Sequence, residues 1–135
     1  MNFKFGALSI ERLAGVDTRL VELMQQALAH SPVDFGIAYM GGLRTAHEQN
    51  ELYRKGATKI DGYSKISKHQ VGKAIDVLPY INGKPNTSNI NAYCIIAGVV
   101  LAIAHLKGLD IVWGGTFGAG GAEWNGWDKP HFEIR

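Results

Sequence analysis

Two histidines and one aspartate have the residue types and spacing to hold a metal ion. His69 and Asp76 are separated by a short segment that contains Gly72 and Ala74, and His131 lies near the end of the chain. A loop that ends at His69 can turn at Gly72, so that a following strand returns Asp76 toward the imidazole. Ala74 would share a strand face with Asp76 and leave room there for a metal and a substrate.

This set of donors is typical of catalytic zinc. A catalytic site offers three protein ligands and leaves the fourth position to water or substrate, whereas a structural site usually closes its shell with cysteine. The chain has a single cysteine, Cys94, which lies in an apolar stretch and is expected to be a buried hydrophobic residue. Because zinc activates water and polarises carbonyl groups, the set predicts a hydrolase with one Zn²⁺ per chain.

A hydrolase of this kind needs a group that takes the proton of water and passes it to the leaving group. Asp128 is the first candidate, because it lies three residues before His131. Glu133 is the alternative, although it could instead hydrogen-bond a metal ligand. Arg44 could grip a substrate carboxylate with its planar guanidinium, or merely pair with Glu48 on a helix.

Other residues of these types are expected to play smaller parts. Three histidines are expected to lie near helix ends or on the surface, outside the metal site: His30, His47 and His105. One of three tryptophans could line a substrate groove: Trp113, Trp124 or Trp127.

Alternating short helices and strands must position these side chains. Three helices are expected: one capped by Asp17 and ending near His30, one capped by Thr45 and running to about Lys55, and one capped by Ser88 and reaching Lys107. Strands are expected over residues 33–39, 74–78, 110–113 and 131–134, with Pro79 and the turn at Asn82 and Gly83 closing the second. This order predicts an α+β fold, in which helices pack against a small, mostly antiparallel sheet.

Composition narrows the classes of function. The 135 residues fit one domain, residues 1–135, and 46% of them are apolar, enough for a core without disulfides. A net charge of +2, with no basic run among aromatics, argues against nucleic-acid binding. The first residues do not resemble a secretory signal, and the longest apolar run, 92–106, is too short to span a bilayer. We therefore expect a monomer that is made in the cytoplasm without a signal peptide and does not span a membrane.

One segment resembles a known family. Residues 67–76, which read SKHQVGKAID, are similar to the S-x-H-x-x-G-x-A-x-D signature of VanY-like and D-alanyl-D-alanine peptidases. The chain is most similar to phage endolysins of the L-alanyl-D-glutamate peptidase type. That similarity continues in residues 42–45 and 79–84 and reaches residues 3–6, so it covers nearly the whole chain. We therefore expect no separate wall-binding domain.

The resemblance implies a Hedgehog/D-Ala-D-Ala peptidase-like fold and a role for each site residue. It implies that His69, Asp76 and His131 bind zinc and that Asp128 is the catalytic acid and base. It further implies that Arg44 positions the substrate or stabilises the developing oxyanion, and that Ser67 shapes the pocket.

The function implied is that of an endolysin that hydrolyses the L-alanyl–D-glutamate bond in the stem peptide of peptidoglycan and lyses the host. Such an enzyme would be made in the host cytoplasm and would reach the wall through a separate pore. A D-alanyl-D-alanine carboxypeptidase is the alternative with the same chemistry. A non-catalytic, zinc-containing wall-binding module is the alternative of another class, although it would have no need of Asp128.

Overall fold

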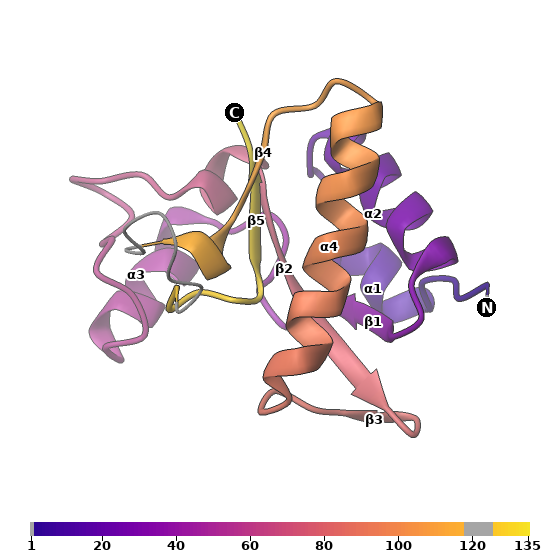
Figure 1. The fold of residues 1–135 in the computed structure, drawn as a ribbon. Helices are drawn as coiled ribbons and strands as arrows, with labels where there is room; N and C mark the ends of the chain where they lie inside the picture. Colours follow the sequence, from indigo (N-terminus) through magenta and orange to yellow (C-terminus); the bar gives the residue numbers. More distant parts are fainter. Residues whose placement is uncertain (1, 118–125) are drawn as a thin grey trace.

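The computed structural model of the protein describes residues 2–117 and 126–135. Within them the strands form one antiparallel sheet in the order β1-β2-β5-β4, and β3 pairs with the outer end of β2 (Figure 1). The strands are β1 (Asp34–Ile37), β2 (Ala74–Ile81), β3 (Lys84–Pro85), β4 (Ile111–Trp113) and β5 (His131–Ile134). The predicted α+β fold is therefore confirmed.

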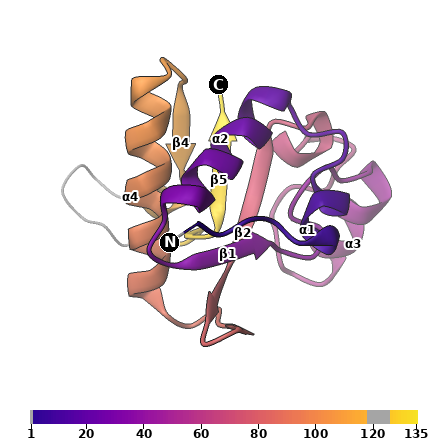
Figure 2. The same ribbon diagram turned by 90° about the vertical axis from the view of Figure 1, so that its right-hand side faces the viewer.

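Helices lie on both sides of this sheet. They are α1 (Ala7–Arg12), α2 (Thr18–His30), α3 (Ala46–Arg54) and α4 (Ile90–Leu106), with the 3-10 helices η1 (Lys68–Val71) and η2 (Gly114–Thr116). The two long helices, α2 and α4, cover one face of the sheet, while α3 and η1 lie beyond the other face (Figures 1 and 2). No helix in the described ranges has both the length and the apolar composition that a membrane crossing requires.

The hydrophobic core fills the space between the sheet and the two long helices. The central strands contribute four side chains to it: Ile75, Val77, Phe132 and Ile134. Because successive side chains of a strand point to opposite faces, the residues between them must face away from this core. Those residues are Ala74, Asp76, His131 and Glu133. Packing of the core against one face of the sheet therefore determines which side chains lie on the opposite face.

Local signals set most of the helix ends as predicted. Asp17 caps α2 by accepting a hydrogen bond from the backbone N–H of Arg19. Thr45 and Glu48 form a reciprocal capping box at the start of α3. The expected cap of α4 was wrong, because Asn89 accepts from the first turn.

Besides the cap at Ser88, the expected end of β2 at Pro79 and the expected burial of Cys94 were wrong. The backbone N–H and hydroxyl of Ser88 donate to Asn86 instead of capping α4. Pro79 does not end β2, because its carbonyl accepts from the backbone N–H of Asn86 and the strand continues to Ile81, where it pairs with β3. Cys94 is exposed, not buried, since α4 is apolar on all sides and only its other face meets the core.

The start of α2 also holds the turn that follows His69. Gly72 has φ of +69°, and a Cβ there would approach the carbonyl oxygen of Gly15 to 2.7 Å, so the position requires glycine. The Gly72 carbonyl accepts from the backbone N–H of Asp17 at 2.9 Å. The Asp17 carboxylate accepts from Lys73 Nζ at 2.7 Å. One residue therefore caps a helix and fastens the metal-site turn to it.

Asp17→Ala should lower the free energy of unfolding by about 0.5–2 kcal/mol, the usual range for a lost N-cap. Asp17→Asn should cost less, because an amide oxygen still caps the helix. Hydrogen bonds from Arg19 and then Lys73 hold the pKa of Asp17 well below its usual range. Because the folded pKa lies below the unfolded one, the stabilisation by this charge is complete above about pH 5 and fades as the pH falls further. Urea unfolding should therefore show a difference in stability between wild type and Asp17→Asn at pH 7 that narrows as the pH falls toward 3; a difference that does not change with pH would contradict this.

Candidate metal centre and active site

The three predicted metal ligands converge on one point. Asp76 and His131 are direct cross-strand partners in β2 and β5, and His69 approaches them from η1. One oxygen of Asp76, Oδ1, lies 3.3 Å from His69 Nε2 and 3.2 Å from His131 Nδ1. One donor atom from each residue lies within 4.8 Å of the other two, so the group can hold a metal ion.

Hydrogen bonds on the far side of each ring set which nitrogen faces the centre. His69 Nδ1 lies 3.0 Å from the carbonyl oxygen of Gly42, and His131 Nε2 lies 2.9 Å from Glu133 Oε1. Both oxygens are acceptors, so in the neutral rings these nitrogens carry the proton. The lone pairs of His69 Nε2 and His131 Nδ1 are then free to bind a cation. Glu133 therefore hydrogen-bonds a candidate ligand, which was one of its two alternatives.

Arg44 holds the other oxygen of Asp76. Its NH2 group donates to Asp76 Oδ2 at 2.9 Å, its Nε to the Met40 carbonyl at 2.6 Å and its NH1 to Gln49 Oε1 at 3.1 Å. The pairing with Glu48 that was considered from sequence is not observed, because Arg44 forms its ion pair with Asp76. The guanidinium adds a fixed positive charge to the wall of the site, and its role toward substrate stays a prediction.

The sequence next to His69 fixes the position of its backbone. The Ser67 hydroxyl accepts from the backbone N–H of His69 at 3.2 Å, and the backbone N–H of Ser67 donates to Gln70 Oε1 at 2.9 Å. Ser67 is buried in the pocket wall, where this cap is its visible contact. On the facing segment, a Cβ at Gly42 would collide with the Arg12 carbonyl, so only glycine lets the Gly42 carbonyl reach His69.

Asp128 stands beside the three ligands but outside their group. Its Oδ2 lies 3.8 Å from His131 Nδ1, and it lines the same pocket of about 420 Å³ as His69 and Asp76. Burial raises the pKa of Asp128, and the negative charge of Asp76 raises it further. A carboxylate with a raised pKa is a better proton acceptor than an exposed one, which suits a general base.

The carboxylates around His131 favour positive charge at the centre. Burial by itself would raise the pKa of Asp76, but hydrogen bonds from His131 and His69 outweigh it and hold this pKa well below its usual range. Burial would likewise lower the pKa of His131, yet Asp76 and Glu133 outweigh it and the pKa is raised. Asp76 therefore stays ionised, and the surroundings that stabilise an imidazolium also suit a metal cation.

Comparisons with known proteins show the family to which this chain belongs. The model of a family described as phage L-alanyl-D-glutamate peptidase matches residues 1–134. The chain belongs to this family. It is 33% identical over 135 residues to the L-alanyl-D-glutamate peptidase of Escherichia phage T5, covering 100% of this chain and 91% of that protein. The crystal structure of the Serratia marcescens L-Ala D-Glu endopeptidase ChiX superposes with a TM-score of 0.78 at 30% identity, covering 99% of this chain and 91% of that one.

The structure also locates the histidines that were expected to lie outside the metal site and two of the three tryptophans that could line a groove. The three remaining histidines are exposed and lie outside the metal group: His30, His47 and His105. Trp113 is buried and donates its indole N–H to the Lys129 carbonyl at 2.7 Å. Trp127 lines the pocket, whereas Trp124 lies outside the described residues.

Three contributors to the site were missed by sequence reasoning. Gln49 is buried and holds Arg44, Phe117 packs its ring 5.6 Å from that of His131, and Gly42 supplies the carbonyl that orients His69. Gln49 lies on a helix that looks exposed in sequence, and a carbonyl carries no signature of its own. The Gly pair at 41–42 is the local signal that could have indicated a close backbone approach in this segment.

Removing the oxygen that orients His131 should weaken metal binding. We expect Glu133→Ala to lower zinc affinity by about 10- to 100-fold, the usual cost of losing such an outer partner. Glu133→Gln should lose less, because its amide oxygen can still accept from Nε2. Competition with a chromogenic chelator measures both affinities, with the exposed Glu22→Ala as control. Zinc affinity of Glu133→Ala equal to that of wild type would show that this hydrogen bond does not support the site.

Proposed function

We propose that this chain is a zinc-dependent endolysin that hydrolyses the L-alanyl–D-glutamate bond in the stem peptides of peptidoglycan. One observation carries the proposal: His69, Asp76 and His131 converge in a pocket whose wall also holds Asp128. Membership of the phage L-alanyl-D-glutamate peptidase family supports both the reaction class and the substrate.

The donor set fits zinc. Two imidazole nitrogens and one carboxylate oxygen are a usual protein contribution to catalytic zinc, and they leave a position open for water or substrate. The outer hydrogen bonds to Gly42 and Glu133 are the kind that orient histidine ligands. A zinc ion held here would supply Lewis acidity, which activates water and polarises a carbonyl group.

The residues of the chain supply proton transfer and charge. In this proposal Asp128 takes a proton from the attacking water and delivers it to the amine nitrogen of the departing D-glutamate. The raised pKa of Asp128 favours the first of these transfers. Arg44 presents its guanidinium at the same pocket, where a fixed positive charge stabilises the negative charge that develops on the carbonyl oxygen.

The setting of the reaction belongs to the same proposal. Residues 1–135 act as one peptidase domain and as a monomer, with peptidoglycan as the partner. The protein is made in the host cytoplasm and reaches the wall through a pore formed by another phage protein. The likeness to the enzyme of Escherichia phage T5 supports this setting.

Purified peptidoglycan should be cut by the zinc-loaded protein and left intact after chelation. Mass spectrometry should find glycan-bound L-alanine with a free carboxyl group and peptides that begin with D-glutamate. Free D-alanine as the sole product would instead indicate a D-alanyl-D-alanine carboxypeptidase. A folded, zinc-loaded protein that cuts nothing would support the wall-binding module.

Asp128→Asn should lower kcat by about 10²- to 10⁴-fold, because the amide cannot accept the proton of water. Its zinc content should equal that of wild type, since Asp128 lies outside the ligand group. The exposed Asp110→Asn is the matched control and should keep full activity. If Asp128→Asn retains wild-type turnover, another group is the base.

A further inference from the structure

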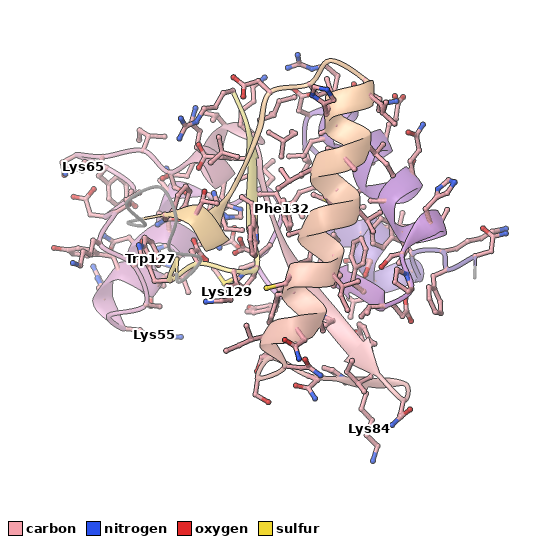
Figure 3. All side chains as sticks on the ribbon, in the orientation of Figure 1. Lys55, Lys65, Lys84, Trp127, Lys129 and Phe132 are labelled. Carbon is pink, nitrogen blue, oxygen red and sulfur yellow. The ribbon has the colours of Figure 1, made fainter. Side chains whose placement is uncertain are left out.

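The pocket at the metal centre opens into a second pocket. The second has a volume of about 500 Å³ and is lined by residues 56–60 and Trp127. Ala57, Thr58, Ile60 and Trp127 line both pockets, so the two form one continuous groove. Figure 3 shows Trp127 on the side of the molecule away from α4, near Lys129. We call the second pocket the Trp127 pocket.

Two aromatic ring contacts connect Trp127 to the candidate metal ligand His131. Its indole packs on the ring of Phe117 with centroids 5.9 Å apart, and Phe117 in turn lies 5.6 Å from the ring of His131. The indole is thus two ring contacts from a candidate metal ligand. Yet 76% of Trp127 is exposed. A large aromatic surface left open inside a groove is available to a ligand rather than to the core.

The opposite wall is fastened to the metal site by hydrogen bonds. Gln49 Nε2 donates to the carbonyl of Ile60 at 3.0 Å, and Gln49 Oε1 accepts from Arg44, which itself holds Asp76. Thr58 turns its hydroxyl to the backbone N–H of Ile60 at 3.2 Å. The wall formed by residues 56–60 is therefore held in a set position relative to the ligands. Such preorganisation lowers the entropic cost of binding.

The lining of the Trp127 pocket suits a largely neutral ligand with a face that can stack on the indole. Lys59 is the one charged residue among those that line it in the described ranges, beside apolar side chains, Thr58 and the indole. Beyond D-glutamate the stem peptide carries free carboxylates. On the alanine side the lactyl carboxyl is consumed in an amide, and the next group is the neutral sugar ring of muramic acid.

The length of the substrate agrees with that choice. One alanine and one lactyl unit separate the scissile bond from the sugar. At about 3.5 Å per residue these units span roughly 7 Å. A sugar at that distance lies within reach of an aromatic side chain two ring contacts from His131.

The geometry points to the Trp127 pocket as a subsite for the N-acetylmuramic acid residue of the substrate, with one face of the sugar stacked on the indole. The inference rests on the proposed function and deepens it. The C–H groups on a sugar face carry partial positive charge, which the negative face of the indole attracts. The Thr58 hydroxyl and Lys59 can meet the polar rim of the ring. The enzyme would then recognise the sugar nearest the scissile bond as well as the peptide.

The test compares two substrates that differ only in the sugar ring. One is a stem peptide with N-acetylmuramic acid on its L-alanine, and the other carries N-linked lactate in place of the muramyl group. Wild type should show a kcat/KM about tenfold higher for the muramyl peptide. Trp127→Ala should lose most of that ratio, while Trp127→Tyr, which keeps an aromatic face, should retain most of it.

Tyr63→Ala is the matched control, because Tyr63 is an exposed aromatic residue that lines neither pocket. It should keep the wild-type ratio, and the zinc content of every variant is measured alongside. Equal kcat/KM of wild type for both substrates would overturn the subsite. So would an equal loss on both substrates in Trp127→Ala.

A binding measurement separates this inference from the proposed function. Calorimetry compares N-acetylmuramyl-L-alanine with N-lactyl-L-alanine on zinc-loaded wild type and Trp127→Ala. The sugar should strengthen binding to wild type and add little to binding by the variant, whether or not either substrate is cut. Cleavage without any such preference refutes the subsite alone, whereas sugar-dependent binding without cleavage refutes the peptidase and keeps the subsite.

Discussion

The carboxylate of Asp76 is the interaction on which the site depends. One oxygen faces the two imidazole nitrogens and the other holds Arg44, so three side chains take their positions from a single group. Asp76 is opposite His131 because β2 and β5 pair in one register. A shift of one residue would turn Asp76 toward the core and Ile75 toward the site. The same packing that buries Ile75 and Phe132 therefore sets the geometry of the metal centre.

The segment between β1 and α3 is the second support. The carbonyl of Gly41 accepts from the backbone N–H of Asp76 at 2.8 Å, and the carbonyl of Gly42 orients His69. The backbone N–H of Arg44 donates to the His69 carbonyl at 3.1 Å. This segment therefore contacts two of the three candidate ligands, His69 in η1 and Asp76 in β2. Its two glycines let the backbone come close enough to do so.

Sequence reasoning succeeded where the signal is local. The period of two along residues 74–76 and 131–133 places Asp76, His131 and Glu133 on one face, and the caps at Asp17 and Thr45 start their helices as expected. The spacing of Asp128 and His131 suggested the proton-transfer group, which the family resemblance then supported, whereas the substrate came from the resemblance alone. The remaining features depend on contacts between distant segments, which no local pattern encodes.

Three features show this limit. Arg44 pairs with Asp76, which is 32 residues away in the chain and lies on a central strand. In sequence, the nearby Glu48 looked equally suitable as a partner. The apolar run of α4 has no polar face, so the exposure of Cys94 could not be foreseen. The place of Trp127 in the groove depends on how the chain returns to β5.

The most direct test of the account is a crystal structure of the zinc-loaded protein, with the metal identified by anomalous scattering at the zinc edge. We expect the ion to be bound by His69 Nε2, Asp76 Oδ1 and His131 Nδ1, with Glu133 still accepting from His131 Nε2 and Asp128 outside the ligand shell. Coordination through His131 Nε2, or by Glu133 in place of Asp76, would contradict the arrangement described above.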